Sequence, residues 1–155
     1  MVSIDPSTKV TGMALFHGGE LTTSYAINLS ASKKDAEGRI LDMGREIMTK
    51  LDEWNPAILY VEQPQGHGNN IRVARLISEL IGFCKAWAVQ NNAYIEEIPP
   101  SVWRKYLGLD QGGKKREQLK RDSMNAVLDV FGINVSEDES DAINIGSAML
   151  QRYTE

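Results

Sequence analysis

Four carboxylates stand at positions from which a folded chain could bring them together. Asp5 and Glu62 each end a short apolar segment that is typical of a β-strand, and ligands bind in the crevice at the carboxyl ends of the strands in open α/β sheets. Asp138 and Asp141 are three residues apart, so they share one face of a helix. Considered alone, each of these four carboxylates has an ordinary structural explanation, because acids are favoured in a first helical turn and an aspartate can close a turn.

Taken together, the four carboxylates predict a metal site. Converging carboxylates repel one another, and a divalent cation with oxygen ligands relieves that repulsion. Mg²⁺ accepts a few carboxylates and completes its coordination with water and substrate phosphate. Two such ions about 3.5–4 Å apart can activate an attacking water and stabilise the leaving oxygen of a phosphodiester. The chemistry that fits is therefore metal-dependent phosphodiester hydrolysis.

A basic segment accompanies these acids in a chain of net charge −4. Localised positive charge is typical of a face that binds a polyanion, although two solvated helix faces would give the same counts. Trp103 adjoins this segment and fits either a core anchor or a base-stacking platform. Within residues 104–121, seven basic residues face two acidic ones, and the seven are Arg104, Lys105, Lys114, Lys115, Arg116, Lys120 and Arg121.

Length and composition predict one soluble domain that spans residues 1–155. Hydrophobic residues make up 42% and charged residues 25% of the chain, which is ordinary for a globular protein and excludes a disordered or collagenous one. A single cysteine, Cys84, cannot form an internal disulfide, which favours a reducing compartment. The sequence contains no apolar run long enough to span a membrane and does not begin as a signal peptide does.

The elements that must position these residues predict an α/β fold. Strands are expected at 2–5, 11–17 and 21–29, then at 58–62 and 94–98, where Pro99 and Pro100 end the last one. Helices are expected at 35–54, 71–89, 114–131 and 138–153, the last one starting at an S-x-x-E capping box formed by Ser136 and Glu139. This order predicts a five-stranded mixed sheet flanked by helices.

The third strand shows a period of two along its length. Leu21, Thr23, Tyr25, Ile27 and Leu29 alternate with the residues between them. Since successive side chains of a strand point to opposite faces, these five are expected on one face of the sheet.

Three motifs that contain the carboxylates resemble those of the RuvC-like Holliday junction resolvases. Residues 4–12, IDPSTKVTG, resemble the opening I-D-P-G-x-x-x-T-G of that family. Residues 60–64, YVEQP, resemble its second motif, a strand that ends in Glu-Gln, and residues 138–142, DESDA, resemble its closing D-x-x-D-A. The motifs occur in the family's order and at its spacing, so the resemblance covers essentially the whole chain.

The resemblance implies a ribonuclease H-like fold and a homodimer that cuts four-way DNA junctions and other branched DNA with Mg²⁺ or Mn²⁺. By motif position, the family's catalytic, metal-binding carboxylates correspond to Asp5, Glu62, Asp138 and Asp141. The basic residues of 104–121 correspond to the family's DNA-binding face, and His67 is a further candidate contact. The compact chain is most similar to phage-borne members, which implies action in a host cytoplasm in recombination, packaging or repair.

Two departures from the family pattern stand out. Ser7 replaces the usual glycine of the first motif, although serine suits turns well. The segment after Glu62 holds no Phe, Tyr or Trp before Phe83, whereas bacterial members carry an aromatic residue there that is thought to wedge against bases. We therefore expect recognition by branch shape and backbone charge instead of base sequence.

Three alternatives accompany this interpretation. An actin-like ATPase or sugar kinase also ends its first strand in Asp, but it needs two domains of this topology. A catalytically silent DNA-binding homologue would have no need to hold four mutually repelling acids. An RNA-directed ribonuclease H-type nuclease stays open, since the residues by themselves do not separate DNA from RNA. EDTA should abolish nuclease activity without abolishing plain DNA binding.

Overall fold

The computed structural model describes residues 1–65, 71–109 and 112–153. Within these residues, the strands form one mixed sheet in the order β3-β2-β1-β4-β5. The first three strands are antiparallel neighbours, and β4 and β5 extend the sheet in parallel from β1. The strands are β1 (Val2–Asp5), β2 (Val10–His17), β3 (Glu20–Asn28), β4 (Ile58–Glu62) and β5 (Tyr94–Ile98).

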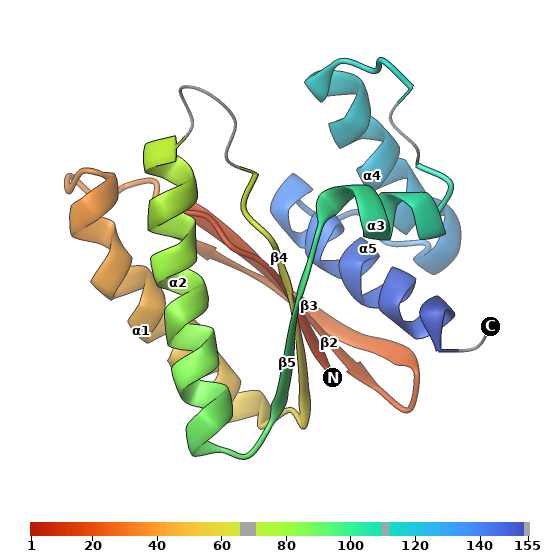
Figure 1. Cartoon of the computed structure of the whole chain (residues 1–155). Coiled ribbons are helices and arrows are strands. Elements are labelled where there is room, and N and C mark those ends of the chain that lie inside the picture. Colours follow the sequence, from red (N-terminus) through yellow and green to blue (C-terminus); the bar gives the residue numbers. More distant parts are fainter. Residues whose placement is uncertain (66–70, 110–111, 154–155) are drawn as a thin grey trace.

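Helices cover both faces of this sheet (Figure 1). One face packs against two helices in a single apolar cluster. On the other face one helix packs across the strands, and two further helices pack against that helix. The first pair is α1 (Ala36–Trp54) and α2 (Ile71–Gln90), and the second group is α3 (Pro100–Tyr106), α4 (Arg116–Phe131) and α5 (Glu137–Arg152). The protein is therefore a three-layer α/β structure, as the sequence predicts.

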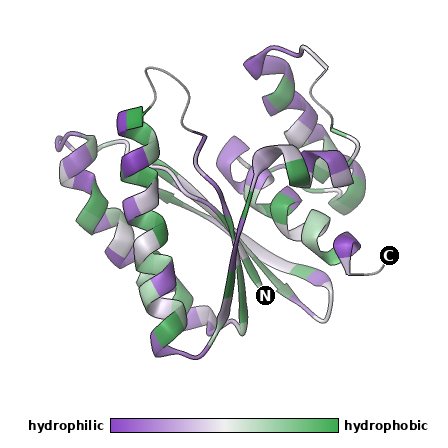
Figure 2. Ribbon diagram, viewed as in Figure 1, coloured by the Kyte–Doolittle hydropathy of each residue, from purple (hydrophilic) through white to green (hydrophobic). Residues whose placement is uncertain are grey.

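Helix α1 shows how local sequence produces one of these layers. The side chain of Asp35 accepts a hydrogen bond from the backbone N–H of Gly38 and so caps the start of the helix. Met43, Ile47 and Leu51 follow at helical spacing and are all buried, which directs one face of the helix to the sheet. In Figure 2 the helices carry hydrophilic residues on their outer surfaces, while the strands between the layers are largely hydrophobic.

Helix α5 is the central element of the opposite layer. Ser136 and Glu139 form the predicted capping box at its start. Ala142, Ile143 and Ala148 lie completely buried along its length. Because α5 packs across β1, β2, β3 and β4, its first turn lies beside the middle of the sheet.

The sheet corrects one expectation about β3. Leu21 packs with Phe16 on the α5 side of the sheet, whereas Ile27 belongs to the core beneath α1 and α2. The register shifts where Leu15 pairs with Thr23 and Phe16 with Leu21. Between these two pairs β3 has one residue more than β2, which is a β-bulge. Because side chains alternate with a period of two, the bulge moves Leu21 to the other face of the sheet.

The sequence does not predict helix α3, because Pro99 and Pro100 indicate only the end of a strand. Pro100 occupies the first turn of α3. A proline suits that position, because its missing N–H has no helical partner there and its φ is already helical. In the described part of the chain, no helix is long and apolar enough to cross a membrane.

Candidate active site

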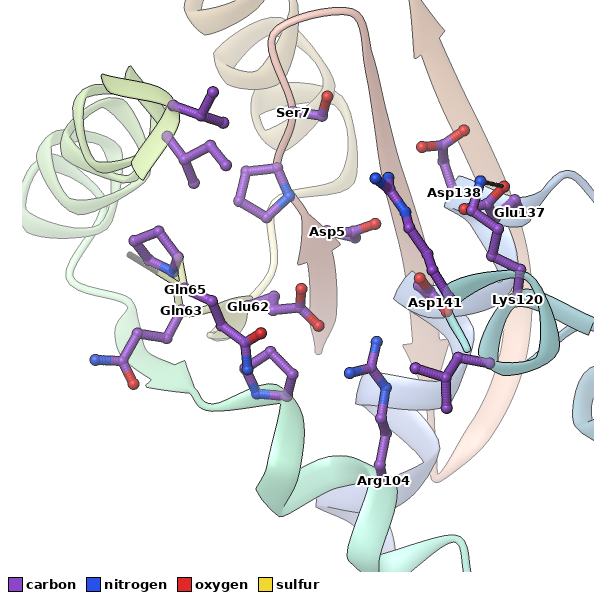
Figure 3. Close-up of a pocket in the computed structure, with 17 residues that line it drawn as sticks. Asp5, Ser7, Glu62, Gln63, Gln65, Arg104, Lys120, Glu137, Asp138 and Asp141 are labelled. Carbon is purple, nitrogen blue, oxygen red and sulfur yellow. Dashed lines mark ion pairs between the residues drawn. The ribbon is translucent and has the colours of Figure 1, made fainter. Parts of the chain in front are cut away.

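The carboxylates of Asp5 and Glu62 converge because β1 and β4 are parallel neighbours. Ile4 pairs with Val61 in the register of these strands, so the next residue of each strand lies at the same edge of the sheet. The start of α5 lies beside this edge and adds Asp138 and Asp141. All four side chains line one pocket of about 330 Å³ and are labelled in Figure 3. The structure thus brings together the four acids that the sequence singles out.

The electrostatics of the pocket reflect this crowding. Burial raises the pKa of Asp5 well above its ordinary value, and the charges of Glu62, Asp141 and Asp138 raise it further. Burial likewise raises the pKa of Asp138 and that of Asp141. Since each negative charge here is destabilised by desolvation and by its neighbours, a cation placed among them would be stabilised.

Glu62 is held by hydrogen bonding from α3. Its Oε2 accepts a 2.7 Å hydrogen bond from the indole N–H of Trp103. Burial raises the pKa of Glu62 to about 7, while the Trp103 hydrogen bond and the Arg104 charge act in the opposite direction. Arg104 therefore supplies the positive charge on the β4 side of the pocket, where its side chain points toward Glu62 (Figure 3).

Asp141 is held by a polar network between α4 and α5. The hydroxyl of Ser123 donates to Oδ1 of Asp141. The side-chain amide of Asn144 donates in turn to the backbone carbonyl and the hydroxyl of Ser123, at 2.9 and 2.8 Å. Ser123 and Asn144 are buried, so this network fixes the side of α5 that faces the pocket. Sequence reasoning missed both residues, since neither lies in a motif.

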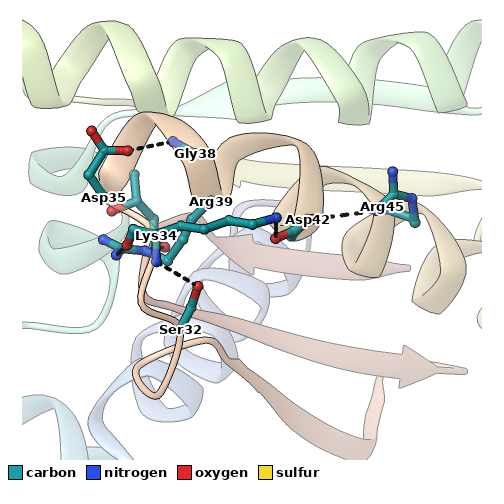
Figure 4. A network of polar contacts seen from close by, with 8 residues as sticks. Ser32, Lys34, Asp35, Gly38, Arg39, Asp42 and Arg45 are labelled. Atoms are coloured by element: carbon teal, nitrogen blue, oxygen red, sulfur yellow. Dashed lines mark hydrogen bonds and ion pairs between the residues drawn. The ribbon is translucent and has the colours of Figure 1, made fainter.

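The turn after β1 is fixed from two sides. Thr11 and Ser7 exchange hydrogen bonds of 2.9 and 3.0 Å between the Thr11 hydroxyl and the Ser7 backbone. Arg39 of α1, which is buried, donates from Nε to the Thr8 carbonyl at 2.8 Å and lies within the polar network at the start of α1 (Figure 4). Ser7 does not adopt a positive φ, so this turn does not require the glycine of the family motif.

The predicted basic residues divide into two groups. Arg104, Arg116 and Lys120 line the pocket with the acids, and Lys120 makes a 2.9 Å ion pair with Glu137. The others point elsewhere, with Lys114 and Arg121 lining one separate hollow, Lys105 lining another, and Lys115 preceding α4 as its N-cap residue. His67 lies outside the described residues.

The donor set of the pocket suits a hard divalent cation. Its acids are oxygen donors, which Mg²⁺ prefers, and their mutual repulsion is the property that a bound cation would relieve. In the orientations that the described residues adopt, no group of three or more His, Cys, Asp or Glu side chains is close enough to hold an ion together.

No protein-family model and no curated protein matches this sequence. Solved structures do match it. RuvC of Thermus thermophilus in complex with a Holliday junction substrate has a TM-score of 0.73 at 16% identity, covering 99% of this chain and 96% of that one. The fowlpox virus resolvase, solved with substrate Holliday junction DNA, has a TM-score of 0.66 at 15% identity and is covered over 100% of both chains.

A third match is the yeast mitochondrial Holliday junction resolvase Ydc2, with a TM-score of 0.63 at 15% identity over 97% of this chain and 77% of that one. The three proteins share this chain's fold over nearly its whole length. The fold is therefore the ribonuclease H-like fold of the RuvC-type resolvases, as the motif resemblance implies.

Proposed function

We propose that this protein is a metal-dependent endonuclease that resolves Holliday junctions and other branched DNA, with residues 1–155 acting as one nuclease domain. The observation that carries the proposal is the convergence of Asp5, Glu62, Asp138 and Asp141 in one pocket, on a fold shared with three junction resolvases. Motif, geometry and fold point to the same chemistry.

In this proposal the four acids are the metal ligands, and Mg²⁺ is the expected ion, with Mn²⁺ as a substitute. The bound metal would supply activation of water and stabilisation of the leaving phosphodiester oxygen. The protein's part is to hold the ligands at the ends of β1 and β4 and on the first turns of α5. Arg104, Arg116 and Lys120 supply positive charge beside the ligands, where the phosphates of the bound strand would lie.

The protein is expected to act as a homodimer, because two active sites related by a two-fold axis suit a junction with the same symmetry. Analytical ultracentrifugation of the native protein, alone and with a four-way junction, tests this, and a monomer under both conditions would overturn it.

The direct test is cleavage of labelled four-way, three-way and linear DNA side by side, with Mg²⁺ and then with EDTA. We expect cleavage of the branched substrates that EDTA abolishes while junction binding persists. Binding without cleavage under all conditions would identify a catalytically silent homologue. An RNA–DNA hybrid in the same assay would reveal a ribonuclease H-type nuclease if it were cut in preference to the branched DNA.

A further inference from the structure

Trp103 contacts two charged residues of the pocket from the protein interior. Its side chain is completely buried in the layer of α3 and α5. Its indole N–H donates the 2.7 Å hydrogen bond to Oε2 of Glu62. The guanidinium of Arg104 lies over its ring, with Cζ 4.6 Å from the ring centroid. One buried side chain thus touches both Glu62 and Arg104, which themselves line the pocket.

The orientation of this indole is set by its packing. Trp103 shares a buried cluster with Tyr60 of β4, Ile98 of β5 and residues of α5 that include Ile145 and Met149. A side chain packed on several sides keeps one rotamer, and its N–H then has one direction. A buried indole N–H needs an acceptor, and here the acceptor is a carboxylate, which makes the hydrogen bond charge-assisted.

The two contacts have different consequences for the pocket. The hydrogen bond engages one oxygen of Glu62 and limits rotation of the carboxylate, which leaves Oε1 for a ligand in the pocket. Hydrogen bonds of this kind orient metal-binding groups in many proteins. The cation–π contact places Arg104 over the ring face, with its charged end directed toward Glu62 (Figure 3).

We propose that Trp103 is a positioning residue of the active site, whose N–H orients Glu62 for metal binding and whose ring supports Arg104. This role rests on the proposed function, because it assumes that Glu62 is a metal ligand. The sequence allowed Trp103 as a core anchor or a base-stacking platform. Its complete burial excludes base stacking, and its hydrogen bond gives the buried residue a role at the site.

The test compares Trp103→Phe with a matched control. Trp87 is also buried, and its indole N–H donates a 2.6 Å hydrogen bond to Oδ1 of Asp52. Trp87 belongs to the opposite layer, in the core beneath α1 and α2. Trp87→Phe therefore removes the same kind of hydrogen bond and a similar volume from the core, but away from the pocket. Mn²⁺ is the probe, and its binding is measured by electron paramagnetic resonance and calorimetry.

We expect Trp103→Phe to weaken Mn²⁺ binding by about tenfold to a hundredfold, as loss of an outer hydrogen bond to a ligand does, and Trp87→Phe to leave it unchanged. In a Glu62→Ala background, which removes the acceptor of this hydrogen bond, Trp103→Phe should weaken Mn²⁺ binding no further, because its effect acts through Glu62. If Trp103→Phe does not fold, 3-benzothienylalanine at position 103 replaces the N–H with sulfur in a ring of the same shape and should give the same loss.

Three outcomes would overturn the role of Trp103. They are native-like Mn²⁺ binding by Trp103→Phe, equal weakening by Trp87→Phe, and an undiminished effect of Trp103→Phe in the Glu62→Ala background. If the native protein binds Mn²⁺ and cuts branched DNA in the same experiments, each of these outcomes overturns the role of Trp103 and leaves the proposed function intact. A native protein that binds no Mn²⁺ would instead overturn the proposed function together with the role of Trp103.

Discussion

Gly12 of β2 lies directly against the backbone of Asp138 at the start of α5. A Cβ placed on Gly12 would come within 1.8 Å of the Asp138 carbonyl oxygen, so no other residue fits this position without moving the helix. Gly12 is also the register partner of Asp5 across β1 and β2. The absence of one side chain thus lets the helix that carries Asp138 and Asp141 reach the strand that ends in Asp5.

Gly12→Ala should therefore lower both stability and cleavage. The new methyl overlaps backbone atoms that cannot rotate away, and overpacking of this kind costs about 1–3 kcal/mol in the free energy of unfolding. Urea denaturation and junction cleavage measure the two effects. Gly112→Ala is the matched control, because a Cβ there meets no atom within 4 Å. Native-like stability and cleavage in Gly12→Ala would contradict the importance of this contact.

Neutralising any one of the pocket acids should abolish cleavage while junction binding stays the same or tightens. The variants are Asp5→Asn, Glu62→Gln, Asp138→Asn and Asp141→Asn. A metal contributes several kcal/mol to catalysis, so loss of a ligand should slow cleavage about a thousandfold or more. Binding persists because a negative charge that faces phosphate is lost. Asp129→Asn, on an exposed part of α4, should cut normally, and parallel loss of binding and cleavage would identify the acids as structural.

The raised pKa of Glu62 predicts a stability that falls with rising pH in the absence of metal. Its pKa moves from 4.5 to about 7 on folding, so the folded state binds the proton more tightly. Stability should then decrease between about pH 4.5 and pH 7, by about 1.4 kcal/mol for each unit of pKa shift at most. Thermal unfolding in EDTA measures this slope.

Glu62→Gln is the control for that slope, because glutamine does not titrate and can still accept the Trp103 hydrogen bond. It should show a shallower decrease than the native protein over the same pH window. Mg²⁺ should raise the melting temperature of the native protein more at pH 8 than at pH 5, since the carboxylates bind metal when deprotonated. Identical pH profiles for the two proteins would show that Glu62 is not the group responsible.

Arg116 and Lys114 should differ as DNA contacts, although the sequence treats them alike. Arg116 lines the pocket, whereas Lys114 pairs with Asp122 at 2.7 Å and lines a separate hollow. Arg116→Ala should weaken binding about equally for all DNA sequences and reduce the salt slope by about one unit. Lys114→Ala is the matched control and should change the slope less. Equal slopes for native protein and Arg116→Ala would remove Arg116 from the interface.

Cleavage should occur at many positions near the crossover and on forks as well as four-way junctions. Base sequence is read at base edges or at steps opened by an inserted side chain, and residues 63–82 contain no Phe, Tyr or Trp to insert. Gln65 lines the pocket, so Gln65→Phe should narrow the cleavage pattern and Gln65→Leu less so. Mapping of cuts on junctions with varied core sequences decides this, and cleavage confined to one short consensus would refute it.

The sequence by itself determined the local features of the site. Asp5 and Glu62 end strands, Asp138 and Asp141 share a helical face, and Ser136 with Glu139 caps that helix. Each of these depends on residues a few positions apart, because strand alternation, helical spacing and capping are short-range properties. The three motifs also located the four acids correctly within one pocket.

Only the tertiary structure decided which distant side chains meet. The crossover that makes β4 a parallel neighbour of β1, the bulge that turns Leu21 away, and the contact of Gly12 with α5 all depend on how layers pack. The same holds for the hydrogen bond of Trp103 to Glu62. The buried residues of α3 and α4 set how each helix is rotated about its axis. This rotation decides which basic side chains face the pocket, and it cannot be derived from the number of charges in the sequence.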